Sequence, residues 1–162
     1  MADFAKDYDL RQMRLISVTG EELDLRYVFV EMNLYEDIWS PTLSGDLTIS
    51  DAQNLLMNFP IFGFEDLILE FGTPGKPIIK KKFRVYSGTH RELGKDRNLV
   101  YVMNFCTPEA LNNYKVRVSK SYKGKLISEM VDDLHNNWLG GGDIEIEPSK
   151  YTYHYVIPNT HP

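Results

Sequence analysis

The chain has 162 residues, which is enough for one domain, or for one domain and part of a second. Hydrophobic residues make up 43% of it and aromatic residues 12%, and these globular proportions exclude a chain that is disordered throughout. The net charge of −5 argues against binding to nucleic acids or to anionic membranes as the main role, because such proteins usually carry a basic excess.

Cysteine content and the N-terminal sequence indicate the compartment. Cys106 is the only cysteine, so no disulfide can form within the chain and the fold does not depend on an oxidising compartment. Residues 1–10 are polar and lack the apolar run of a signal peptide, and we expect them to form a flexible N-terminus. No stretch reaches the ~20 apolar residues of a membrane-spanning helix. We therefore expect a soluble protein that is made in a cytoplasm and does not bind membranes.

Residues 11–106 are predicted to form a series of short strands. The longest run, 23–39, alternates with period two, which is typical of a strand. Its two faces are Val28, Val30, Met32 and Leu34 on one side, and Tyr27, Phe29, Glu31, Asn33 and Tyr35 on the other. Shorter strands are expected at 13–16, 47–51, 67–71, 78–86 and 98–106, with loops at 39–45, 72–75 and 90–97. Such strands without helical crossovers predict a mainly β fold, an antiparallel sandwich or barrel.

The pattern changes after residue 106. Thr107 and Pro108 are typical of a helix start, and a short helix is expected to run to Tyr114. A second, amphipathic helix is predicted from about 124 to 139, because apolar residues recur there at helical spacing. These residues are Leu126, Ile127, Met130, Val131, Leu134 and Trp138.

Two extended segments, 144–146 and 151–157, are expected to follow these helices. A helix and two extended segments cannot enclose a core. Residues 107–162 are therefore predicted to be the start of a helix-containing second domain, a partial α+β unit that is truncated here. We expect the chain to be a fragment of a longer protein.

The sequence contains no convincing catalytic or ligand motif. Residues 72–76 resemble a phosphate-binding loop, but Pro77 stands where that motif requires Ser or Thr, so we interpret them as a turn. The four histidines lack metal-ligand spacing, and Cys106 lacks a Cys-His signature. We therefore predict that the protein is not an enzyme and that it has no catalytic, metal-binding or cofactor-binding residues.

Three other polar or aromatic groups have a structural interpretation. Glu129, Asp132 and Asp133 are interpreted as a solvated helix face. Lys80-Lys81-Lys82 is interpreted as a guard against edge-to-edge strand pairing, with a contact patch for an acidic partner as the alternative. The alternating Tyr151, Tyr153 and Tyr155 are interpreted as sheet surface that packs against another layer, with a platform for stacking sugars or bases as the alternative.

Five segments together resemble the baseplate central hub proteins of contractile-tailed phages. They are DIWSPTLSGDL at 37–47, LTISDAQNLL at 47–56, FPIFGFEDLILEFGTPG at 59–75, VSKSYKGKLISEMVDDL at 118–134 and YHYVIPNTHP at 153–162. The strongest single piece is PIFGFEDL at 60–67. The resemblance implies that 11–106 form a β-barrel-like tube domain, followed by a helix-containing insert and then by a second tube domain that this chain lacks. The spike proteins of secretion systems are related to these hubs and share the barrel.

The resemblance also implies a function, that of a virion structural protein in the baseplate of the tail. Three chains of such a hub form a torus with pseudo-sixfold symmetry, which joins the sixfold tail tube to the threefold central spike. The implied partners are further copies of the chain in a homotrimer, the central spike protein, the tail tube or tube-initiator protein, and the tape-measure protein. DNA is implied only as cargo that passes through the lumen, and assembly is implied to take place in the host cytoplasm.

Aromatic and apolar side chains on strands and loops are the candidates for an oligomer interface, because aromatic anchors dominate protein interfaces. We expect this role for Tyr27, Phe29, Trp39, Ile61 and Phe62. From the residues alone an alternative stays open, a monomeric β-barrel that binds a carbohydrate or another small ligand through Tyr and Trp.

Overall fold

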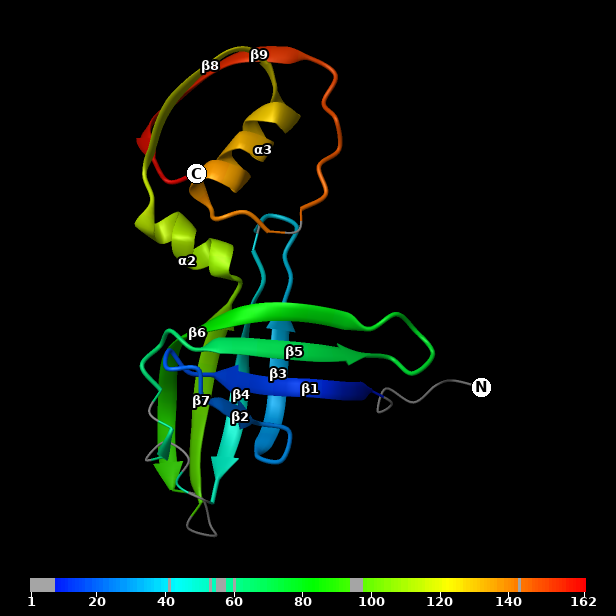
Figure 1. The fold of residues 1–162 in the computed structure, drawn as a ribbon, viewed down its shortest axis with the longest axis vertical. Coiled ribbons are helices and arrows are strands. Elements are labelled where there is room, and N and C mark those ends of the chain that lie inside the picture. The colour runs from blue at the N-terminus through cyan, green and yellow to red at the C-terminus, as the bar shows by residue number, and fades with distance from the viewer. Residues whose placement is uncertain are drawn as a thin grey trace. The chain divides into compact units, whose positions relative to one another are not determined.

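In a computed structural model the chain forms two compact units, Met1–Thr107 and Pro108–Pro162 (Figure 1). The residues that the structure describes are 8–40, 42–52, 54, 58–59, 61–93, 98–142 and 144–162. The fold is mainly β, as the sequence predicted.

The first unit is a curled, antiparallel, half-barrel-like sheet of seven strands in the order β2-β1-β5-β6-β7-β4-β3. The strands are β1 (Asp9–Ile16), β2 (Glu22–Asp24), β3 (Phe29–Tyr35), β4 (Ser44–Asp51), β5 (Asp66–Gly72), β6 (Ile79–Leu93) and β7 (Leu99–Cys106). The antiparallel β architecture expected for this part of the chain is thereby confirmed. Strand β1 begins at Asp9, inside the segment that we expected to be a flexible N-terminus.

Strand β6 belongs to two layers of this sheet. Its first part pairs with β5 up to Arg84, and from Arg84 to Leu93 it pairs with β7. Register shifts follow Val85 and Thr89, and such bulges bend a strand. In Figure 1, β1 and β5 accordingly run across β3, β4 and β7. The bend explains why β6 continues seven residues beyond its predicted end at Tyr86.

The core of the first unit lies between these two layers. It consists of Met13, Leu15, Leu25, Leu47, Ile49, Phe59, Leu67, Leu69, Phe83, Val85, Tyr101, Met103 and Phe105. Phe83 and Phe105 meet edge to face, with ring centroids 5.0 Å apart and planes at 64°. Gly45 makes room for Phe105, because a Cβ atom at position 45 would lie 2.4 Å from Cζ of that ring.

The single strand predicted for residues 23–39 is wrong, because a turn at 26–28 separates β2 from β3, and the strict alternation fails at Val30. A register shift between Phe29 and Glu31 inserts an extra residue into β3 opposite β4. As a result Val28 and Phe29 both pack against the core, while Val30 is 62% exposed. A bulge of this kind leaves the hydrophobic pattern looking regular, so the alternation alone could not predict it.

The second unit contains α2 (Pro108–Lys115), β8 (Val118–Leu126), α3 (Ile127–Trp138) and β9 (Thr152–Thr160). The prediction that a helix begins near 124 is wrong, because this segment ends strand β8, which pairs with β9. Gly124 has a φ of +62°, a conformation that does not continue into a helix. The extended segment expected at 144–146 is irregular rather than a strand.

The second unit has a small core of its own, which we did not expect. Val118, Tyr122, Met130 and Ile157 are buried there, and Val116, Leu134 and Trp138 pack against them. Strand β8 supplies the apolar face that the predicted elements lacked, and α3 packs against it.

Candidate interaction surfaces

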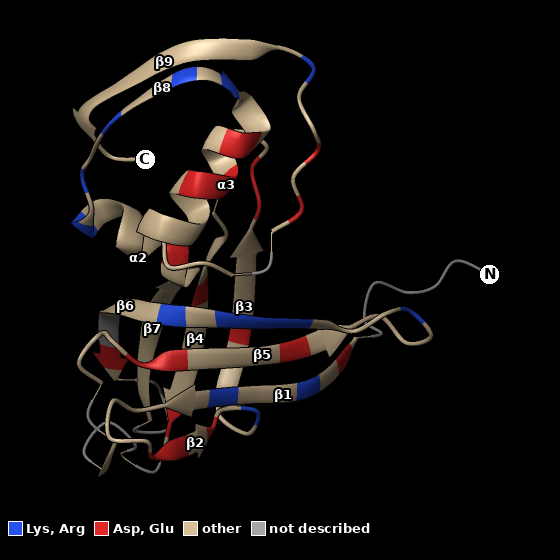
Figure 2. Ribbon diagram, turned by 45° about the horizontal axis from the view of Figure 1, so that its top comes forward, with Lys and Arg blue, Asp and Glu red and all other residues tan. Residues whose placement is uncertain are grey.

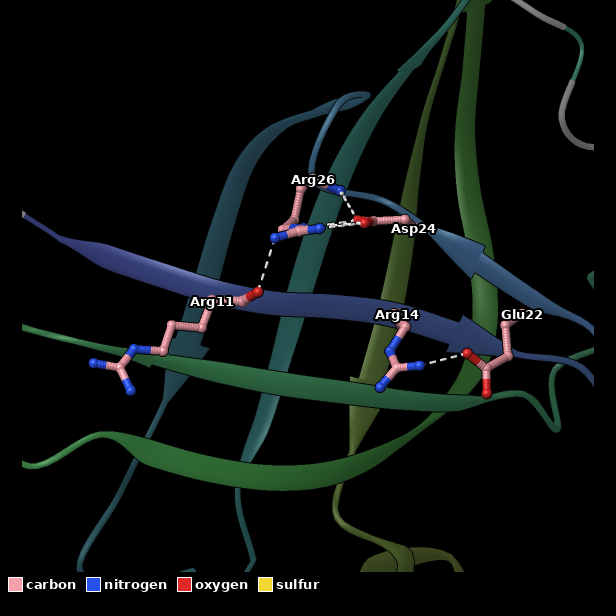
Figure 3. Close-up of polar contacts among 5 residues, drawn as sticks. All are labelled: Arg11, Arg14, Glu22, Asp24 and Arg26. Carbon is pink, nitrogen blue, oxygen red and sulfur yellow. Dashed lines mark hydrogen bonds and ion pairs between the residues drawn. The ribbon is translucent and has the colours of Figure 1, made fainter.

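The two end strands of the large sheet differ in how their free edges are protected. The edge strand β2 has only three residues, and ion pairs surround it (Figure 3). Arg14 pairs with Glu22, and the Arg26 guanidinium donates hydrogen bonds to Asp24 and to the backbone oxygen of Arg11. The hydrogen bond from Arg26 lowers the pKa of Asp24. Short, charged strands of this kind discourage further pairing.

The edge strand β3 is longer and is flanked by exposed apolar side chains. Within the described residues, β3 pairs with β4 alone. Large side chains on this strand and on its flanking turns remain open to solvent, namely Tyr27 (85% exposed), Val30 (62%), Tyr35 (55%), Ile38 (92%) and Trp39 (89%). Several exposed apolar groups along one free edge are typical of an interaction surface.

Hydrogen bonds hold part of this edge in place. The Tyr35 hydroxyl donates to Asp46 Oδ1 at 2.6 Å, and the Asn33 amide donates to Asp46 Oδ2 at 3.1 Å. The bond to Asp46 raises the pKa of Tyr35. The backbone N–H of Trp39 donates to Asp37 Oδ1 at 2.9 Å, so the turn that carries the indole ring is also fixed. Fixed side chains lose less entropy when they bind a partner.

A second exposed aromatic group is held by a buried carboxylate. Glu65 is fully buried, and its carboxylate accepts backbone N–H bonds from Phe62, Gly63 and Phe64 at 2.6, 2.9 and 3.1 Å. Gly63 has a φ of +90°, which glycine adopts readily. The aromatic rings that this loop carries, Phe62 and Phe64, are 73% and 53% exposed. These contacts fall within the segment that carries the strongest part of the family resemblance.

The five residues predicted for an oligomer interface fall into two groups. Tyr27, Trp39 and Phe62 are exposed, whereas Phe29 and Ile61 pack against the core of the first unit. Their part in an interface stays a prediction. Sequence patterns did not point to the exposed Val30, Ile38 and Phe64, although Ile38 and Phe64 directly neighbour predicted residues.

Two lysines of the run 80–82, Lys80 and Lys82, pair with carboxylates of the same chain. Lys82 and Arg84 both contact Asp66 at 2.8 Å, and Lys80 lies 3.9 Å from Glu70. Burial alone would raise the pKa of Asp66, but the hydrogen bonds from Lys82 and Arg84 outweigh it and lower that pKa. Figure 2 shows the resulting blue and red segments on β6 and β5. In the part of the chain that the structure describes, residues 79–83 pair with β5 only, which suits a guard role for the lysines.

Polar contacts join β8 to α3 in the second unit. Asp133 accepts hydrogen bonds from Lys120 at 2.6 Å, from Tyr122 at 2.5 Å and from Asn137 at 3.0 Å. The bonds from Lys120 and Tyr122 lower the pKa of Asp133, while burial and the bond to Asp133 raise the pKa of Tyr122 to about 12. The interpretation of this helix face as merely solvated is therefore wrong for Asp133. It is also incomplete for Glu129, which pairs with Lys125 at 3.6 Å.

Tyr153 and Tyr155 of the tyrosine row lie on β9, which pairs with β8 in a two-stranded sheet, and Tyr151 directly precedes this strand. Tyr151, Tyr153 and Tyr155 are 70%, 47% and 59% exposed. Tyr155 lies opposite the buried Tyr122 of β8, so their side chains share a face. Helix α3 packs against β8.

The other segments and residues considered for catalysis or ligand binding lie in ordinary structural positions. Cys106 is buried at the end of β7. Residues 73–76 form a turn closed by the Lys76 N–H and the Thr73 oxygen at 3.0 Å, as expected for this sequence. Across the described ranges no three His, Cys, Asp or Glu side chains gather as metal ligands do. No helix in those ranges is both long and apolar enough to cross a bilayer.

Comparisons with known proteins give weak structural similarity. No family model and no curated protein matches the sequence. Among solved structures, the chain is similar to a chain of the lidless PdpA–VgrG complex, with a TM-score of 0.46 and 14% identity over 91% of this chain and 29% of that chain. A chain of the half-lidded Francisella PdpA–VgrG complex has a TM-score of 0.40 and 15% identity, with 90% and 26% covered. This chain spans less than a third of those chains, and scores below 0.5 do not establish a shared family or function.

Proposed function

We propose that the chain is a non-catalytic structural module that assembles with further copies of itself through exposed surfaces of its β-sheet. The observation that carries this proposal is the free edge of β3, with Tyr35, Ile38 and Trp39 exposed on it or beside it. A soluble monomer rarely leaves a long edge strand and a row of apolar side chains open to solvent. A neighbouring subunit that covers this edge would remove both the unpaired strand edge and the apolar side chains from solvent.

The difference between the two sheet edges supports this proposal. The β2 edge is short and closed by the ion pairs of Arg14 and Arg26, whereas the β3 edge is open. Subunits that associate through two different surfaces form rings when the rotation between them closes. With one edge protected, the sheets cannot join edge to edge without limit, so the open β3 edge is left as a contact that a specific partner surface can cover.

The finer part of the proposal rests on the resemblance to phage baseplate hubs. We propose a hub module in the tail baseplate of a virion, a homotrimer that joins the tail tube to the central spike. Its further partners are the spike protein, the tail tube or tube-initiator protein and the tape-measure protein, and DNA passes only as cargo.

A monomeric carbohydrate-binding module is the second candidate function. The exposed tyrosines of β9 favour it, because aromatic rows can stack on sugar rings. This candidate predicts a monomer that binds a glycan, with binding lost when Tyr153 and Tyr155 are both replaced by alanine.

Imaging distinguishes the two candidates. The purified chain is mixed with the tube and spike proteins of a contractile tail and viewed by negative-stain electron microscopy, and in parallel it is applied to a glycan array. The hub proposal predicts ring-shaped particles or attachment to the tube or spike. A strict monomer that binds a glycan and ignores the tail proteins contradicts it.

A further inference from the structure

Charge is strongly segregated along this chain. Residues 27–75 contain eight Asp and Glu but no Lys or Arg, although 18 of the 162 residues are Lys or Arg and about five would be expected there. Residues 110–128 show the reverse, with five Lys and Arg and no Asp or Glu. The net charge of −5 is therefore the sum of an acidic region and a basic region that are separate in the sequence. Figure 2 shows the Lys and Arg residues of the basic region in blue on β8.

The acidic region includes the open edge of the large sheet. Glu31, Glu36 and Asp37 are exposed on β3 or just after it, and Asp46 is half-buried on the neighbouring β4. The exposed Tyr35, Ile38 and Trp39 lie among these carboxylates in the sequence. We call this set of residues, Glu31, Tyr35, Glu36, Asp37, Ile38, Trp39 and Asp46, the β3 surface.

The basic region lies on and just before β8. Arg117, Ser119, Ser121 and Lys123 are exposed, while Val118 and Tyr122 between them are buried. Val156 of β9 lies opposite Ser121, so it shares the outer face of the small sheet, and it is 64% exposed. We call this set, Arg117, Ser119, Ser121, Lys123 and Val156, the β8 surface.

The cations of the β8 surface, Arg117 and Lys123, differ from many of the other cations that the structure describes. Lys80, Lys82, Arg14 and Arg26 all have carboxylate partners, as do Lys120 and Lys125. Arg117 and Lys123 make no ion pair with any residue that the structure describes. Exposed cations without partners on a chain of net negative charge are suited to an acidic protein surface.

We infer that the β8 surface of one copy binds the β3 surface of a second copy. The inference rests on the proposed function and names the two surfaces that make the contact between subunits. Arg117 and Lys123 face Glu31, Glu36 and Asp37 of the neighbour, around an apolar centre of Ile38, Trp39 and Val156. An apolar centre with a charged rim is the usual composition of a protein interface. Because the two surfaces differ, the contact is heterologous and propagates from copy to copy.

Charge reversal tests the inference directly. Sedimentation velocity of the full chain at low salt compares the wild type with Lys123→Glu, Glu36→Lys and the double variant that carries both. Each single reversal places like charges opposite each other and is expected to weaken self-association roughly tenfold. The double variant restores opposite charges and is expected to recover most of the association. Added salt should weaken the wild-type association.

Two exposed positions outside both surfaces supply matched controls. Lys76→Glu lies in the turn of residues 73–76, and Glu21→Lys lies in the turn of residues 17–21, so these variants change the net charge equally. Both are expected to associate like the wild type. If Lys123→Glu folds poorly, the neutral variant Lys123→Gln still allows self-association to be measured. It should weaken association less than Lys123→Glu does.

The outcomes separate this inference from the proposed function. If the wild type associates and the reversals behave like their controls, the pairing of these surfaces is wrong while the structural role stands. If the double variant associates no better than the single ones, the pairing is also wrong. If the wild type stays monomeric at every concentration, the inference and the proposed function both fail.

Discussion

At the scale of single residues, Glu65 has the largest expected effect on local structure. Its buried carboxylate accepts three backbone N–H bonds from residues 62–64, one at Oε1 and two at Oε2, and the amide nitrogen of Gln would replace one of these accepting oxygens. We expect Glu65→Gln to lower the free energy of unfolding by roughly 2 kcal/mol, because hydrogen bonds to charged groups contribute ~1.5–3 kcal/mol. Urea unfolding measures the change.

The matched control for Glu65 is Glu70→Gln on the same strand. Glu70 lies 3.9 Å from a largely exposed lysine, so its replacement should change stability by less than about 1 kcal/mol. Equal losses in the two variants would contradict the role assigned to Glu65.

Gly45 tests the packing of the core in the same way. A Cβ atom at this position would overlap the Phe105 ring and the Asn33 backbone oxygen, both 2.4 Å away. We expect Gly45→Ala to destabilise the protein by about 1–3 kcal/mol, the usual cost of overpacking. Gly88→Ala on β6 is the control, since its nearest neighbour there would be 4.0 Å away. Thermal unfolding measures both variants. A lower melting temperature for Gly88→Ala than for Gly45→Ala would contradict this packing of the core.

At the scale of elements, Asp133 joins α3 to β8 through Lys120 and Tyr122. The pKa of Asp133 is lowered in the folded protein. The ionised carboxylate therefore stabilises the fold at pH values above its pKa in the unfolded chain, about 3.9. This stabilisation is lost as the pH falls through the pKa of Asp133 in the folded protein. We expect the second unit to weaken below about pH 4. Asp133→Asn should cost roughly 1–3 kcal/mol at pH 7 and remove this dependence.

The measurement needs a probe in the second unit, because Asp24 and Asp66 of the first unit also have lowered pKa values. Trp138 packs against the core of the second unit, and replacing Trp39 with Phe leaves it as the only tryptophan. Urea unfolding followed by its fluorescence at pH 3 and pH 7 gives the comparison. The control is Asp132→Asn, an exposed neighbour, and equal pH dependence in the two variants would contradict the role of Asp133.

Alternation and turn residues were enough to predict most strands of the first unit, but not the turn at 26–28 that separates β2 from β3. They could not predict the bulge in β3, because the extra residue depends on the pairing with β4. Strand β8 was missed because its partner β9 begins 26 residues after β8 ends, and because apolar spacing of four continues backward from α3 to Leu126. Pairing between distant segments leaves little trace in a local pattern.

The candidate surfaces were predictable only in part. Loop aromatics such as Trp39 and Phe62 could be expected to lie outside the core, and they do. Phe29 and Ile61 looked equivalent in sequence but pack inward, Phe29 because of the bulged register of β3 and Ile61 because of the conformation of the loop before β5. The buried position of Glu65 could not be foreseen either, since its partners are backbone groups of a loop whose conformation depends on Gly63.

At the scale of the whole molecule, the proposed self-association depends on the β3 surface. Trp39 is its most exposed aromatic residue, and aromatic anchors of this kind dominate interface energies. Replacing it with alanine should therefore weaken association by roughly 10- to 100-fold. Tyr114 on α2 is the matched control, because it is also an aromatic residue, is 79% exposed and lies outside both surfaces.

The molar mass of the purified full chain over a range of concentrations tests the structural role most directly. Light scattering should give a mass that rises above the 18.8 kDa of one chain as the concentration increases. Trp39→Ala should shift that rise to higher concentration, and Tyr114→Ala should leave it unchanged. A mass of 18.8 kDa at every concentration would contradict assembly through the exposed sheet edge.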